Sequence, residues 1–158
     1  LLVTGACGYI GSHFVCHYLS QTDEDVVAVD NFSMGHRQAL TPWQGRIRFY
    51  DHDIADREAL ARLMKENQVS AVVHFAANAY VGESQVLPFK YLDNNVGGST
   101  GLLQAMAEVH AEDVGAGDGT GDDHGILVPG AHPRTTSDRP SDARSASVIA
   151  RVARATGS

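Results

Sequence analysis

Residues 1–11 read LLVTGACGYIG, a short apolar run followed by three glycines. The apolar run at its start stops at Gly5, and Gly8 and Gly11 follow at three-residue spacing. Residues 10–19 then carry apolar side chains at the spacing of one helix face. The pattern predicts a strand, a tight glycine turn and a helix in direct succession.

The glycine turn has the features of a phosphate-binding site. Glycine at the three positions lets the backbone turn sharply, approach a pyrophosphate and pack the helix on the strand, and the first helical turn offers free N–H groups to the phosphates. Residues 26–29 form a second buried run that ends at Asp30, whose carboxylate can accept both hydrogen bonds from a ribose and repel a 2′-phosphate. The unit predicts a dinucleotide site that prefers NAD to NADP.

Strands and helices keep alternating further along the chain. Residues 47–50 read as a strand, residues 71–75 as a strand of continuous hydrophobicity, and residues 56–64 as a helix for which Asp56 is a suitable N-cap. Residues 86–109 carry a long helical pattern interrupted by glycines. This order predicts an α/β fold, a truncated Rossmann-like, doubly wound parallel sheet with strand order 3-2-1-4 and helices on both faces.

Composition excludes several classes of protein. Twelve Lys and Arg against nineteen Asp and Glu give a net charge of −7, which disfavours a nucleic-acid binder because such proteins need a cationic surface. No apolar run approaches the roughly 18 residues of a membrane span. The two cysteines, Cys7 and Cys16, cannot form a disulfide framework, so we expect a reducing, cytoplasmic environment.

The composition changes abruptly near residue 110. All eleven aromatic residues lie before this point, and residues 111–158 contain no Phe, Tyr, Trp, Met, Asn, Gln or Lys. So little large apolar surface cannot offset the entropy of ordering the backbone. We therefore expect residues 1–110 to form an incomplete NAD-binding domain, and residues 111–158 to be a disordered or loosely attached low-complexity tail. A frame-shifted or mis-joined translation would explain the change, and a native tail is the alternative.

Several motifs in register resemble a known family. They are the segments Leu2–His13, Asp30–His36, Asp53-Ile54, His74–Ala77, Val81–Ser84 and Asp93–Val96. Together they resemble the extended short-chain dehydrogenase/reductase family of NAD-dependent epimerases and dehydratases, and within it the UDP-glucose 4-epimerases. The resemblance covers about residues 1–110.

The resemblance implies a set of NAD-binding residues. Tyr9 and Ile10 match positions at the pyrophosphate, Asp30 and Asn31 match the ribose-binding pair, and Asn94 matches an asparagine near the nicotinamide. Ala79 stands where some members of the family have a lysine that reaches the cofactor phosphate. The complete predicted set is Gly5, Gly8, Tyr9, Ile10, Gly11, Asp30, Asn31, Phe32, Ser33, Met34, Gly35, Asp53, Ile54, Phe75, Ala76, Ala77 and Asn94.

The resemblance also implies a reaction. Members of this family interconvert UDP-glucose and UDP-galactose through a 4-keto sugar, using NAD, a Ser or Thr and a tyrosine with lysine four residues later. No tyrosine of this chain has lysine at that spacing, so no catalytic residue is assigned and we expect the chain alone to be inactive. Full-length relatives imply a UDP-sugar substrate and allow a homodimer. The alternatives are a catalytically silent NAD-binding or partner-binding module, and part of another NAD-dependent nucleotide-sugar epimerase or dehydratase.

Other polar residues have simpler explanations. His13 and His17 share a helix face but lack a third metal ligand, so we assign no metal site. His74 is expected to be a packed core residue. The resemblance puts Glu83 and Ser84 in a family motif close to the sugar site, and the simpler alternative is that they cap a helix that begins near residue 86. We also expect the outer edge of the strand at 71–75 to be unpaired and the chain therefore to be poorly soluble. Residues 125–128 of the tail could cover this edge, but the run is short and begins at a glycine.

Overall fold

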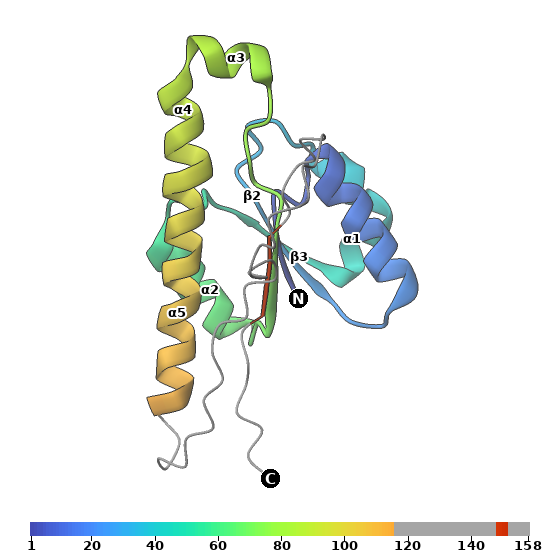
Figure 1. The fold of residues 1–158 in the computed structure, drawn as a ribbon. Coiled ribbons are helices and arrows are strands. Elements are labelled where there is room, and N and C mark those ends of the chain that lie inside the picture. Colours follow the sequence, from blue (N-terminus) through green and yellow to red (C-terminus); the bar gives the residue numbers. More distant parts are fainter. Residues whose placement is uncertain (116–147, 152–158) are drawn as a thin grey trace, which may run out of the picture.

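The computed structural model describes residues 1–115 and 148–151. A parallel sheet lies between two helical layers (Figure 1). The strands run in the order β3-β2-β1-β4-β5, and the first four are parallel. The elements are β1 (Leu2–Thr4), α1 (Tyr9–Gln21), β2 (Val26–Asp30), the 3-10 helix η1 (Arg37–Arg46), β3 (Ile47–Asp51), α2 (Arg57–Glu66), β4 (Ala71–His74), α3 (Val81–Val86), α4 (Pro88–Leu92), the π-helix η2 (Asp93–Gly98), α5 (Ser99–Gly115) and β5 (Val148–Arg151).

The two central strands are buried on both faces. Every residue of β1 and β2 is buried, as continuous apolar parallel strands require when helices cover them on either side. One apolar cluster joins the sheet to α2 and α5, and a second joins it to α1 and η1. Figure 1 shows these helices on opposite sides of the sheet. The predicted fold class and the order 3-2-1-4 are therefore confirmed for the first four strands.

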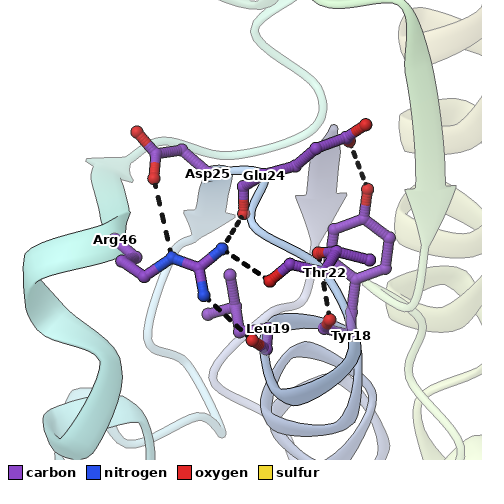
Figure 2. A network of polar contacts seen from close by, with 6 residues as sticks. All are labelled: Tyr18, Leu19, Thr22, Glu24, Asp25 and Arg46. Carbon is purple, nitrogen blue, oxygen red and sulfur yellow. Dashed lines mark hydrogen bonds and ion pairs between the residues drawn. The ribbon is translucent and has the colours of Figure 1, made fainter.

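Arg46 fastens the end of α1 to the start of β3. Its Nη1 donates to the carbonyl of Leu19 at 2.9 Å, and its Nη2 donates to the carbonyls of Thr22 at 2.9 Å and Glu24 at 2.7 Å (Figure 2). Asp25 lies 3.9 Å from Nε. A cation at this place meets the negative end of the helix dipole and takes carbonyl groups that have no partner inside the helix.

The helix at 57–66 begins as the sequence predicts. Asp56 Oδ1 accepts a hydrogen bond from the backbone N–H of Ala59 at 3.0 Å, so Asp56 is the N-cap. The helical pattern at 86–109 corresponds instead to α4, η2 and α5, preceded by the separate short helix α3. Pro88 begins α4, and Gly98 ends η2 at a point where a Cβ would lie 2.6 Å from Ile54 Cδ1. Glycine lets this helix approach the loop that follows β3.

The outer edge of β4 is paired, contrary to the expectation from sequence. Residues 148–151 form β5, which runs antiparallel to β4 with Val72 opposite Ala150. An antiparallel strand needs no crossover helix, so a segment far along the chain can reach this edge. Residues 111–115 continue α5. The remaining tail expectations, including residues 125–128 as a cover, concern positions outside the described residues.

No helix in the described part of the chain is long and apolar enough to cross a membrane.

Candidate functional site

The glycine turn after β1 is forced by close packing. Gly5 has φ +65°, and a Cβ on it would lie 2.6 Å from the backbone of Phe75 and Ala76. A Cβ on Gly11 would lie 2.1 Å from the carbonyl oxygen of Gly5. Both positions exclude any side chain for reasons internal to the fold.

Gly8 differs from the other two glycines. Its φ is −71°, and an added Cβ would meet only the carbonyl oxygen of Gly5, at an ordinary 3.4 Å. The fold therefore tolerates a methyl group here. Gly8 also lines a pocket and is the N-cap of α1, which within the described residues has no side-chain cap and no acid in its first turn. A bare, uncapped helix start beside a pocket is suited to an anion.

Asp30 connects the end of β2 to the glycine turn. Its Oδ2 accepts the backbone N–H of Cys7, and its Oδ1 accepts the backbone N–H of Phe32, both at 2.8 Å. Only 8% of Asp30 is exposed, yet the residue lines the pocket. Each carboxylate oxygen has two acceptor sites, so one remains on each for a ligand hydroxyl.

A second polar pair stands beside Asp30. Asn31 Nδ2 donates to Asp53 Oδ2 at 2.8 Å, which joins the loop after β2 to the loop after β3. Asn31 Oδ1 accepts the N–H of Ser33, and Asp53 Oδ1 accepts the N–H of Ala55. Both side chains are thereby oriented before any ligand binds.

The loop after β4 is held by two asparagines. Asn94 Nδ2 donates to the carbonyl of Ala76 at 3.3 Å and to Asn95 Oδ1 at 2.9 Å. Asn95 Oδ1 also accepts the backbone N–H of Asn78, and Asn95 Nδ2 donates to the carbonyl of Asn78. Asn78 and Asn95 were not predicted as site residues from the sequence, although two adjacent asparagines in a helical stretch are a usable signal for side chains that hold a loop.

One pocket brings most of the predicted cofactor residues together. It lies at the carboxyl ends of the parallel strands, where ligands bind in open α/β sheets. Its volume of about 90 Å³ is below the ~300–1,000 Å³ of complete small-molecule sites, so it holds only part of an extended ligand. The lining includes twelve predicted residues, Gly5, Gly8, Asp30, Asn31, Ser33, Met34, Gly35, Ile54, Phe75, Ala76, Ala77 and Asn94, and three that were not predicted, Val29, His52 and Asn78.

Five predicted residues are not part of this lining. Tyr9 and Ile10 lie in the first turn of α1 and are exposed, and Gly11 is buried against Gly5. Phe32 packs on the α1 side of the sheet, and Asp53 is exposed in the loop after β3.

Comparisons with known proteins agree on the family. The model of the NAD dependent epimerase/dehydratase family matches residues 1–117. The chain belongs to this family. A UDP-glucose 4-epimerase from Streptococcus mutans is 46% identical over 109 residues, which cover 68% of this chain and 32% of that protein. The chain thus spans about a third of the length of such a relative.

Solved structures of family members superpose on the same region. A UDP-glucose 4-epimerase from Stenotrophomonas maltophila, with NAD and formylated UDP-arabinopyranose bound, has a TM-score of 0.64 at 43% identity and covers 68% of this chain and 33% of its own. A dTDP-glucose 4,6-dehydratase from Streptomyces venezuelae with NAD bound has a TM-score of 0.65 at 36% identity, covering 68% and 35%.

Two buried titratable side chains next to residues of the pocket, Cys7 and His74, are uncharged at neutral pH. Burial, followed by the nearby Asp30 charge, raises the pKa of Cys7 to about 12, so the thiol is not a nucleophile at neutral pH. His74 is a packed residue, as predicted from sequence: its Nδ1 lies 2.6 Å from Thr4 Oγ1 and its Nε2 2.9 Å from Ser99 Oγ, and burial lowers its pKa.

Two polar residues differ from their predicted role as helix caps. Glu83 and Ser84 lie inside α3, which ends at Val86. Glu83 accepts hydrogen bonds from Lys90 Nζ at 2.8 Å and Tyr91 OH at 2.7 Å, and thereby connects α3 to α4. The capping prediction failed because the chain turns between these helices at Pro88. In the described residues, no group of three His, Cys, Asp or Glu side chains is placed to hold a metal.

Proposed function

We propose that residues 1–115 are the NAD-holding part of a UDP-glucose 4-epimerase-like enzyme that acts on a UDP-sugar. The single observation that carries this proposal is the Asp30 carboxylate. It stands at the end of β2, lines the pocket, and is bonded to the backbone of the glycine turn. An acid at this place selects a free ribose over a 2′-phosphate.

The residues present fit a dinucleotide. The pyrophosphate would meet the uncapped start of α1 at Gly8, where the backbone leaves room. Asp30 would accept the ribose hydroxyls, and Asn31 and Asp53 would lie toward the adenine. The small residues Ala76 and Ala77 would leave space for the nicotinamide half. Bound NAD would supply a reversible hydride acceptor for C4 of the sugar, by way of a 4-keto sugar.

This chain supplies binding and orientation, and we assign it no proton-transfer group. None of its five tyrosines is followed four residues later by lysine, the arrangement that lowers the pKa of a tyrosine through a nearby cation. We therefore expect no epimerisation of UDP-glucose by the chain alone. Measurable interconversion to UDP-galactose would refute this part of the proposal.

A Gly8→Ala variant tests cofactor binding separately from folding. The φ of −71° accepts alanine without strain, so we expect an unchanged melting temperature. The methyl group would fill the cradle for the pyrophosphate, and we expect NAD affinity to fall about ten-fold or more, the equivalent of ~1.4 kcal/mol. Gly45→Ala is the matched control, because a Cβ at Gly45 has nothing within 4 Å.

Calorimetry on the unmodified chain gives the decisive comparison. We expect NAD to bind and NADP to bind more weakly, because Asp30 would repel the 2′-phosphate. Equal or tighter binding of NADP would show that the role given to Asp30 is wrong.

A second candidate function remains within the same family. The dTDP-glucose 4,6-dehydratase resembles this chain in structure as closely as the epimerase does. The cofactor half of the site is common to both reactions, and the sugar half decides between them. Under either function, NAD binding and its dependence on Gly8 are expected to be the same.

A further inference from the structure

His52 lines the pocket but matches none of the motifs that predict cofactor contacts. It follows the last residue of β3 and is half-buried. Strand pairing places Asp30 of β2 opposite Asp51 of β3, so Asn31 and His52 leave the sheet at the same level. His52 therefore lies across from Asn31, the residue that follows Asp30.

A row of side chains on one face of β3 leads to the imidazole. Arg48, Tyr50 and His52 alternate with the other residues and share one face. The Tyr50 and His52 rings are nearly parallel, at 19°, with centroids 6.4 Å apart. Tyr50 OH accepts a hydrogen bond from Asn67 Nδ2 at 2.8 Å, and Arg48 Nη1 donates to Asn67 Oδ1 at 2.9 Å.

Asn67 itself is fixed by the end of α2. It is the C-cap of that helix, and its Nδ2 also donates to the carbonyl of Leu63 at 2.8 Å. The helix end thus positions Tyr50, whose ring lies beside the imidazole of His52. A planar side chain with only two rotatable bonds loses little conformational entropy when a ligand packs against it.

We propose that His52 packs its ring against the adenine base of the cofactor. The inference rests on the proposed NAD function and adds a contact to it. With the ribose at Asp30, the base must lie farther toward β3, where Ile54 and His52 line the pocket. A planar π system beside an apolar side chain suits a purine, because aromatic rings stack on bases.

Three variants of the full chain test this contact by calorimetry with NAD and with ADP-ribose. In His52→Ala we expect both ligands to bind about five-fold more weakly or worse, since stacking on a base is worth ~1 kcal/mol or more. In His52→Phe we expect affinity close to that of the unmodified chain, because a ring is restored. His17→Ala, at an exposed histidine of α1 outside the pocket, is the control and should bind normally.

The results of these measurements distinguish a failure of the His52 contact from a failure of the NAD proposal. If the unmodified chain binds neither ligand, the NAD proposal fails and this inference fails with it. If it binds NAD and His52→Ala binds equally well, only the role of His52 is overturned. A His52→Phe variant as weak as His52→Ala, with an unchanged melting temperature, also overturns it, as does a loss for NAD that ADP-ribose does not share.

Discussion

Replacing Asp30 by alanine should weaken the fold as well as the cofactor site. The carboxylate accepts two backbone N–H groups, from Cys7 and Phe32, both at 2.8 Å. Hydrogen bonds to a charged group are worth roughly 1.5–3 kcal/mol each, and water can replace part of the bond to Phe32. We expect Asp30→Ala to cost about 3 kcal/mol, which lowers the melting temperature by roughly 10 °C for a domain of this size.

The assay is thermal unfolding followed by circular dichroism without ligand. Asp53→Ala is the matched control, because Asp53 also accepts two hydrogen bonds but is exposed, so its loss should cost about 1 kcal/mol or less. A melting temperature for Asp30→Ala equal to that of Asp53→Ala would refute the idea that Asp30 fastens the glycine turn to β2. Loss of NAD affinity in Asp30→Ala would then be attributed to ligand contacts alone.

Three further predictions concern the stability of the fold without bound cofactor. Arg46→Ala removes three bonds to backbone carbonyls and should cost about 2 kcal/mol in urea unfolding, with Arg46→Lys intermediate. Cys7 keeps its proton up to about pH 12 in the folded chain but loses it above pH 9.0 when unfolded, so stability should fall as pH rises above about 9. The urea midpoint of Cys7→Ala should not show that fall. Burial lowers the pKa of His74 from its ordinary 6.5, so the unfolded chain gains a proton first and stability should decline as pH drops below about 6.5. An equally steep acid decline in His74→Asn would contradict this.

The sequence predicted the features that depend on local pattern. Continuous apolar runs indicated β1, β2 and β4, because parallel strands that helices cover on both faces are apolar along their length. β3 was also predicted, although Arg48 interrupts its apolar run and only Ile47 is buried. Gly5 and Gly11 could be recognised because close backbone packing tolerates no other residue there. Asp30 was predicted at the end of β2 from its spacing alone.

Features that depend on contacts between distant segments were missed. Antiparallel pairing of β5 with β4 joins residues far apart in sequence, and nothing in its local pattern names its partner. Asn95 clamps Asn78 across the loop after β4, and His52 enters the pocket because two strands end at the same level. Side chains of this kind are positioned by tertiary structure, which periodicity does not encode.

Because β5 (Val148–Arg151) pairs with the outer edge of β4, any other strand that binds this edge must compete with β5. An edge strand offers its free hydrogen-bonding groups to one neighbour only, and β5 already occupies that side. Any separate polypeptide that adds a strand there, such as the remaining portion of a longer relative supplied in trans, must first displace β5. Because β5 belongs to the same chain as β4, it competes as an intramolecular partner, whereas the incoming strand must bind from solution. If an enzyme were reconstituted from separate fragments, an incoming strand could pair with β4 only after β5 had left. The rate of reconstitution would therefore depend on how often β5 dissociates from β4.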